Sequence, residues 1–393
     1  MNRRGMHDVA VVGAGMVGAA LALRLAESGF DVALIEAREP PPLRAEDDVD
    51  LRVVALAPSS VAFLDRVGAW KNIAASRAYA YTHMHVWDAA APGTLNFDAR
   101  EQGESALGYI VENRLIQSVL WNSLKQAHIA LRVPANVVST DVDADRRVLA
   151  LDDGTSLSAK LVIAADGAES ALRKMSGIEI TERGYEQRAI VAHVETDRPH
   201  ESTAWQRFLP HATLAFLPLG DGRSSIVWSA PVDEVERLLA LDDAAFCREL
   251  GVAFDFRLGN ITVTTKRVAI PLRLLLAKRY VAPRLALAGD AAHVVHPLAG
   301  QGVNLGLRDA AELADALIDA RESKRDFADE VVLRRYERRR RSDDSLSAYA
   351  FDAIQRVFGS ERLPLAAARG AVLSIVDRLP PLKKLFARHA AGR

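Results

Sequence analysis

Three glycines near the N-terminus have the spacing of a phosphate-binding turn. Gly13, Gly15 and Gly18 follow the apolar run 9–12 in G-x-G-x-x-G order, and Glu36 ends the next apolar run. In such a turn the first glycine allows the bend, the second admits a pyrophosphate, and the third lets helix and strand pack closely. A carboxylate at the position of Glu36 can accept hydrogen bonds from a ribose diol. The pattern predicts a dinucleotide site, but NAD and FAD share it.

Two further predicted strands end in an acidic residue beside a glycine. Residues 161–164 precede Asp166-Gly167, and residues 285–288 precede Gly289-Asp290. Because ligands bind at the carboxyl ends of parallel strands, both loops could meet the same dinucleotide. Asp290 could accept hydrogen bonds from ribityl hydroxyls, whereas Asp166 could equally be a turn residue.

A second glycine-rich helix start lies near Gly300, Gly302 and Asn304. Glycine disfavours helix interiors, so bare backbone at this place needs a reason. The N–H groups and positive dipole end of a helix would face a group that becomes negative. A reduced flavin carries such charge at its N1–O2 edge, and NAD offers no equivalent. This helix start favours FAD, and Pro297 would fix the loop before it.

The composition is that of an ordinary globular protein, with 49% hydrophobic and 26% charged residues. The net charge of -1 gives no support to nucleic-acid binding. The single cysteine, Cys247, excludes an internal disulfide, fits a reducing cytoplasm and is expected to be a buried small hydrophobe. No histidine, cysteine and carboxylate set has metal-ligand spacing, so we predict no metal. No apolar run is long enough to span a membrane.

These motifs must be positioned by an α/β fold. We expect a discontinuous Rossmann-like FAD domain with a parallel sheet, an antiparallel-sheet substrate domain and a helical C-terminal extension. The expected FAD-binding domain covers 1–75, 100–180 and 275–335, the substrate domain 76–99 and 181–274, and the extension 336–393. Short strands with turn signals such as Asp221-Gly222 indicate the antiparallel sheet.

Aromatic residues gather in the predicted antiparallel sheet, at Trp205, Phe208, Phe216 and Trp228. They either fill the core of the sheet or, for one or two of them, face an aromatic substrate.

The chain ends in a basic segment with a helical pattern. Arg338 to Arg341 are most simply a solvated helix face, and Lys383, Lys384 and Arg388 lie among apolar residues near the end. A basic amphipathic end can lie on an anionic membrane surface or dock on a partner subunit.

In order, the glycine turn, Asp166-Gly167 and Gly289-Asp290 resemble the three motifs of the FAD-dependent aromatic hydroxylases of the para-hydroxybenzoate-hydroxylase type. The segments 51–60, 108–124 and 296–317 are similar in particular to the ubiquinone-biosynthesis hydroxylases. The resemblance covers nearly the whole chain.

This resemblance implies an FAD site. Gly13, Gly15, Gly18 and Glu36 would hold the adenosine diphosphate end, and Asp290 the ribityl and pyrophosphate part. Pro297, Gly302, Val303 and Asn304 would lie along the flavin ring. Asp166 and Arg173 would serve cofactor handling and fold together.

Two arginines and two histidines each have two interpretations. Arg52 would lie near the flavin or the nicotinamide cofactor, although it could be an ordinary surface cation. Arg114 would contact FAD from a helix start, although it could pair with Glu112 or a surface acid. His293 and His296 are candidate general bases, but loop histidines are more often structural, and the catalytic residue is left unknown.

The resemblance further implies a monooxygenase that hydroxylates an aromatic ring through a flavin C4a-hydroperoxide, with NAD(P)H as electron donor and O2 as co-substrate. The substrate would be a polyprenyl phenol on the way to ubiquinone. The protein would be cytoplasmic, either free or peripheral at the inner membrane. Two alternatives remain: a hydroxylase of a soluble aromatic substrate on the same fold, and an FAD-stabilised non-catalytic subunit of a lipid-synthesis complex.

Overall fold

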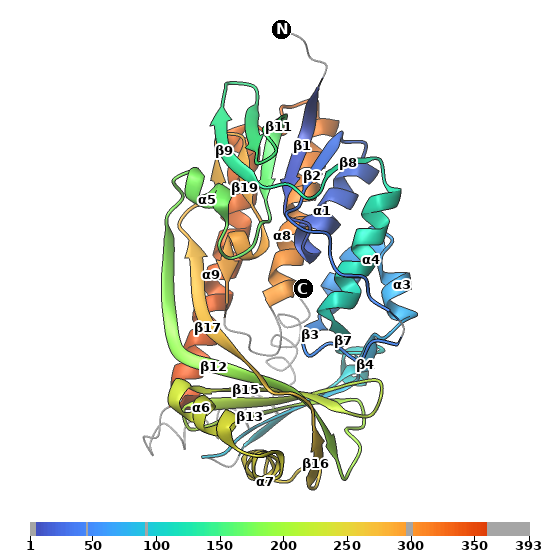
Figure 1. Ribbon diagram of the computed structural model, residues 1–393, viewed down its shortest axis with the longest axis vertical. Helices are drawn as coiled ribbons and strands as arrows, with labels where there is room; N and C mark the ends of the chain where they lie inside the picture. The colour runs from blue at the N-terminus through green and yellow to red at the C-terminus, as the bar shows by residue number, and fades with distance from the viewer. Residues whose placement is uncertain (1–4, 45, 91–92, 296–301, 360–393) are drawn as a thin grey trace.

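Parallel strands form one end of the molecule and a large antiparallel sheet the other (Figure 1). The computed structural model describes residues 5–44, 46–90, 93–295 and 302–359, with side chains as far as Asp344. Pro297, His296 and residues 360–393 of the predicted extension lie outside the described residues.

The first sheet has a parallel centre in the order β19-β11-β1-β2-β8. Its strands are rich in buried β-branched and aliphatic side chains because helices cover it, as is typical of parallel sheets. The parallel strands are β1 (Met6–Val12), β2 (Val32–Ile35), β8 (Ile129–Arg132), β11 (Ser156–Ala164) and β19 (Leu285–Leu287). Antiparallel strands at its margins are β9 (Val137–Val142), β10 (Arg147–Leu151) and β18 (Val281–Ala282).

Helices α1 and α8 lie beside each other against this sheet, and their apolar faces join its core. A small sheet, β3-β7-β4, lies between these helices and the antiparallel sheet (Figure 1). The helices of this part are α1 (Met16–Glu27), α2 (Pro58–Arg66), α3 (Trp70–Ala74), α4 (Asn113–Gln126), α5 (Ala171–Met175), α8 (Gly302–Glu322) and α9 (Glu330–Gly359). The small sheet consists of β3 (Val53–Leu56), β4 (Tyr79–Tyr81) and β7 (Gly108–Glu112), and a short 3-10 helix, η1, spans Ala99–Gln102.

The second large sheet has the order β20-β17-β12-β15-β14-β13-β5-β6, with β16 paired to β12. One face is covered by α6 (Val232–Ala240) and α7 (Asp243–Ala253), which lie beneath it in Figure 1. The strands are β5 (His83–Asp88), β6 (Thr94–Asp98), β12 (Ile180–Thr196), β13 (Thr203–Leu209), β14 (Ala212–Pro218), β15 (Ser224–Pro231), β16 (Ile261–Thr264), β17 (Val268–Ala277) and β20 (His293–Val294).

The opposite face of this sheet packs against the small sheet. Leu217 and Ala204 share an apolar cluster with Ala55 of β3 and Ile110 of β7. The two halves of the molecule therefore meet across this face. The predicted α/β class, with a parallel sheet and a separate antiparallel sheet, is confirmed.

Helix α9 corrects one expectation about the basic segment. Arg338 and Arg341 are exposed, but Arg340 is only 4% exposed. Tyr336, one turn earlier, is fully buried, and its hydroxyl donates to the Leu287 carbonyl at 2.7 Å. The prediction of a solvated face was wrong at Arg340, because the helical period places it on the stripe that packs against the core.

Candidate active site

The turn after β1 leaves no room for side chains at two of its three glycines. A Cβ on Gly13 would lie 2.3 Å from the Ala165 carbonyl oxygen, and one on Gly18 would lie 2.1 Å from the Gly13 carbonyl oxygen. At Gly15, by contrast, no described atom lies within 4 Å of an added Cβ. The turn is thus tight at its first and third glycines and open at the second, where a pyrophosphate is expected.

Two carboxylates flank this turn. Glu36 directly follows β2 and accepts a hydrogen bond from the Ala14 N–H at 2.5 Å. Asp166 follows β11, and its Oδ2 accepts from the Leu172 N–H at 3.2 Å. Its Oδ1 is buried and has no partner in the described part of the chain. A buried carboxylate oxygen without a donor is unusual, so a bound ligand would supply a fitting partner.

The Gly289-Asp290 loop and helix α8 reach the same turn. A Cβ on Gly289 would lie 3.1 Å from the Val17 side chain, and one on Gly306 would lie 2.6 Å from it. Helix α1, the 3-10 helix η2 (Gly289–Ala291) and α8 therefore meet at Val17. This contact gives Gly306 its reason, because any side chain there would separate α8 from α1.

Asp290 lies beside this junction, in the 3-10 helix η2. Its side chain is accessible to solvent, yet the protein around it raises the pKa of the carboxyl through desolvation, against the charges of His293 and Arg52. Asp290 also stands at the carboxyl end of β19, next to the ends of β1 and β11.

The first turn of α8 is anchored by Asn304. Its side-chain oxygen accepts from the Ala57 N–H at 2.8 Å and the Ser60 hydroxyl at 2.7 Å, and its amide donates to the Ala55 carbonyl at 2.7 Å. The Asn304 side chain is therefore committed to holding α8 against β3 and α2. At Gly302 an added Cβ would meet no described atom within 4 Å, and Val303 packs partly buried on the core.

The two predicted arginines lie close together at the start of α4. Arg52 is exposed, and its carbonyl accepts from the Asn113 N–H at 2.9 Å, next to Arg114. Arg114 pairs with Asp47 at 3.3 Å, while Glu112 pairs with Arg77. The charge of Arg52 acts on the Asp290 carboxyl and opposes the rise of its pKa.

A buried ionic network lies directly behind Asp290. The Asp309 carboxylate of α8 accepts hydrogen bonds from the Gly289 N–H at 2.9 Å, the His293 ring at 2.6 Å and the Arg340 guanidinium at 2.7 Å. Arg340 also donates to Asp344. This network joins α8, α9 and the Gly289-Asp290 loop.

The protonation states in the network follow from its charges. Burial alone would lower the pKa of His293, but the Asp344 and Asp309 carboxylates outweigh it and raise that pKa to about 9. His293 and Arg340 lower the pKa of Asp309 despite its burial. His293 is therefore a charged structural residue, and a protonated ring cannot accept a proton as a general base.

Among the described residues, His293, Asp309 and Asp344 could in principle ligate a metal, since their ligand atoms lie within 4.8 Å of one another. The Arg340 guanidinium already supplies a cation to both carboxylates. The arrangement is that of an ion-pair network, and the expected absence of a metal stays a prediction.

Several other predicted residues have core positions. Phe216 and Trp228 are buried in the cluster between the antiparallel sheet and helices α6 and α7. Trp205 packs partly buried against this cluster, and Phe208 is also buried. Cys247 belongs to the same cluster, as expected, and burial raises the pKa of its thiol. Arg173 is buried and donates to the Ala291 and Ala168 carbonyls, so it supports the loop that carries Asp290.

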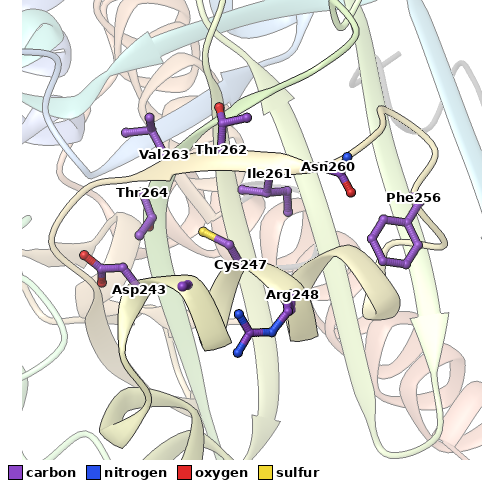
Figure 2. Close-up of a pocket in the computed structure, with 10 residues that line it drawn as sticks. Asp243, Cys247, Arg248, Phe256, Asn260, Ile261, Thr262, Val263 and Thr264 are labelled. Atoms are coloured by element: carbon purple, nitrogen blue, oxygen red, sulfur yellow. The ribbon is translucent and has the colours of Figure 1, made fainter.

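A cavity of about 480 Å³ opens between α7 and β16 (Figure 2). Cys247, Arg248 and Phe256 line one side of it, and Ile261 and Thr264 the other. None of the residues predicted for the FAD site lines this cavity, so the candidate site is the convergence around Gly15 and Asp290.

The residues at this convergence fit FAD. An open glycine position, an orphaned Asp166 oxygen and an accessible Asp290 carboxylate lie at the carboxyl edge of one parallel sheet. The sequence did not single out Asp309 and Arg340, which hold this edge in place. Tyr336, Arg340 and Asp344 are each four residues apart. This helical spacing could have predicted that they lie on one buried face of α9.

Comparison with known proteins extends this assignment. A family model described as an FAD binding domain matches residues 6–344. The chain is 38% identical over 387 residues to a 3-demethoxyubiquinol 3-hydroxylase of Escherichia coli, covering 98% of both chains. It is 39% identical over 386 residues to the ubiquinone hydroxylase UbiL of Rhodospirillum rubrum, covering 98% of this chain and 89% of that one.

A solved structure shares the fold. The p-nitrophenol 4-monooxygenase PnpA of Pseudomonas putida DLL-E4 superposes with a TM-score of 0.77 at 21% identity, over 97% of this chain and 96% of that one. The chain belongs to the FAD-binding-domain family of flavin-dependent monooxygenases that includes the ubiquinone hydroxylases.

Proposed function

We propose that this protein hydroxylates the aromatic ring of a polyprenyl phenol in ubiquinone biosynthesis, using FAD, O2 and NAD(P)H. The observation that carries the proposal is the end-to-end match, at 38% identity, to a 3-demethoxyubiquinol 3-hydroxylase. A ring hydroxylase of this kind needs FAD held at one edge of a sheet and a second, water-excluding surface above the ring.

The proposed FAD residues follow the geometry of the turn. Gly13, Gly15 and Gly18 would hold the pyrophosphate, with Glu36 toward the adenosine ribose and Asp290 toward the ribityl chain. The N-terminus of α8 would supply its positive dipole end to the flavin, through residues 302–304. We assign Pro297, Arg52, Arg114 and Asp166 to the surroundings of the cofactor.

When bound, FAD supplies the reduction of O2 and the transfer of one oxygen atom to the ring. The chain itself orients the cofactor, excludes water and supports the charge of the reduced ring. Ala204 and Leu217 pack on Ala55 and Ile110, and this apolar contact keeps water out of the junction between the two halves.

We retain the domain division at the limits given above as part of this proposal. The separate sheets support it: β5 and β6 pair within the antiparallel sheet, although they precede β7 and α4 in the chain. Among the described helices none is long and apolar enough to cross a membrane. We propose that the basic C-terminal residues hold the protein at the inner membrane surface or in a multi-subunit assembly. A chain ending at Leu379 that still sediments with membranes and partners as the full chain does would contradict this.

The cellular test is the quinone-lipid profile of a source strain that lacks this chain. We expect loss of ubiquinone and accumulation of one under-hydroxylated intermediate, whose structure names the ring carbon. An unchanged profile would count against ubiquinone biosynthesis and favour a soluble aromatic substrate. Restoration by a variant that binds FAD but does not turn over would favour a non-catalytic subunit.

A further inference from the structure

His193 is a buried histidine without a partner. Its side chain, in β12, is about 1% exposed, and neither ring nitrogen has a hydrogen-bond partner among the described residues. The next buried histidine along the chain, His200, contacts the Leu219 carbonyl through one nitrogen and accepts the Ser202 N–H through the other. Buried polar groups nearly always have a hydrogen-bond partner, and both ring nitrogens of His200 do. The ring of His193 has none within the described ranges and therefore has the capacity to bind a further group.

The strand pattern shows which way His193 faces. Ile190, Ala192 and Val194 pack in the core beneath α6 and α7, and successive side chains of a strand alternate between faces. His193 therefore points to the opposite face of the sheet. On that face it is directly paired with Ser225, which is paired in turn with Leu217.

This face is the one that meets the FAD-binding half. Leu217 shares a cluster with Ala55, whose carbonyl is held by Asn304 in the first turn of α8. The charges of Asp48 and Asp50, in the loop just before Arg52, act on the His193 ring. His193 thus lies on the face of the sheet that packs against the small sheet of the FAD-binding half.

Ser225 gives an independent second observation. Its hydroxyl is fully buried and has no partner in the described part of the chain. Directly opposed residues on antiparallel strands have Cβ atoms about 4.5–5.5 Å apart, so the imidazole and the hydroxyl are neighbours. Leu217 and Val227 flank Ser225 on this face, and two adjacent, unpartnered polar groups beside them fit one small polar group of a ligand.

We propose that the His193 imidazole, with the Ser225 hydroxyl beside it, receives the ring hydroxyl of the phenolic substrate and takes its proton. This inference rests on the proposed function. In the step the phenol O–H bond breaks, its electron pair stays on the oxygen, and the proton forms an N–H bond on the ring. The phenolate that results is richer in electrons and reacts more readily with an electrophilic oxygen atom.

The charges around His193 suit this role. Burial lowers the pKa of the ring below its usual 6.5, aided by the Arg223 charge, so the ring is neutral and can accept a proton at neutral pH. Asp221, Asp48 and Asp50 oppose that shift, and they would stabilise the imidazolium once formed. Arg223 is itself paired with Asp48 and Asp221, both at 2.7 Å.

The test compares His193→Gln with His200→Gln in FAD-loaded protein, using a farnesylated phenol as the probe. We expect kcat/KM to fall about 100-fold in His193→Gln, the size typical of a lost general base, with FAD content and unfolding temperature unchanged. In the wild type, kcat/KM should fall as the pH drops through the lowered pKa of His193. His193→Gln should lose this acid limb and His200→Gln should keep it.

A binding measurement adds a readout independent of turnover. In oxidised holoenzyme without reductant, the wild type should bind the farnesylated phenol about tenfold more tightly than His193→Gln, because the variant loses the hydrogen bond to the ring hydroxyl; the ultraviolet difference spectrum of the bound phenol measures this. If the wild type turns over the phenol and His193→Gln has the same kcat/KM, this inference alone is overturned. A wild type that neither binds nor turns over the phenol would overturn the proposed function and the inference together.

Discussion

At the scale of single residues, the glycine motif contains two different constraints. Gly18 is required by the protein itself, because a Cβ there would lie 2.1 Å from a backbone oxygen. Gly15 has an extended backbone with φ of -63° and open space around it, so the protein alone would accept a side chain. A pyrophosphate that approaches the backbone would explain why Gly15 is bare.

These two glycines give a matched pair of variants. Gly15→Ala should keep the unfolding temperature of the FAD-free protein but weaken FAD binding about tenfold or more, which corresponds to about 1.4 kcal/mol. Gly18→Ala should lower the unfolding temperature even without FAD, because the backbone must shift. Differential scanning fluorimetry and flavin-fluorescence titration measure the two effects. Wild-type FAD affinity in Gly15→Ala would show that no phosphate approaches this position.

Residue spacing predicted the tight glycine turn, but it did not predict the residues that hold the neighbouring loop in place. The order of Gly13, Gly15 and Gly18 is a local pattern, so it can be recognised without the fold. Asp309 and Arg340 act across a long separation in the chain, and nothing local marks them. The reason for Gly306, the contact with Val17, likewise exists only after α1 and α8 have packed.

At the scale of elements, α9 is attached to the core through charge as well as apolar packing. Tyr336, Arg340 and Asp344 lie on one helical stripe, and Arg340 and Asp344 both join the network around His293 and Asp309. Removing one partner of such a buried network is costly because another charge is left without its counterpart. The sequence of Arg338 to Arg341 does not reveal this role of Arg340, because the other three arginines are exposed.

The network makes stability depend on pH at the alkaline side. The folded pKa of His293, about 9, lies above the usual 6.5, so its contribution is fully present below 6.5 and is lost as the pH rises through about 9. The full shift corresponds to roughly 3 kcal/mol. We expect the unfolding temperature to fall between about pH 7 and pH 9.5, and this fall to be much smaller in His293→Gln.

His200→Gln is the control for this experiment, because burial lowers the pKa of His200 and the ring stays neutral over the same range. It should retain the wild-type dependence on pH. An identical alkaline fall in His293→Gln would mean that another group is responsible. Tyr280 and Tyr336 face the network as well, but their pKa values are raised well above 10 and they remain neutral in this range.

At the scale of the whole molecule, the two large sheets lie at opposite ends and meet through the small sheet (Figure 1). The parallel sheet brings the ends of β1, β2, β11 and β19 to one edge, as the βαβ pattern of the sequence predicts. The antiparallel sheet carries Leu217, Ser225 and His193 on the face that packs against the small sheet of the FAD-binding half. The pairing of distant strands, such as β5 with β13, was beyond the reach of sequence reasoning because it depends on long-range register.

The central claim is that this protein transfers an oxygen atom from O2 to the ring of a prenylated phenol. The most direct measurement supplies purified, FAD-loaded protein with NADPH, a farnesylated phenol and isotope-labelled O2, and determines the product by mass spectrometry. We predict a ring-hydroxylated product that carries one labelled oxygen atom. Oxidation of NADPH without any hydroxylated product, or a product whose new oxygen is unlabelled, would contradict this account.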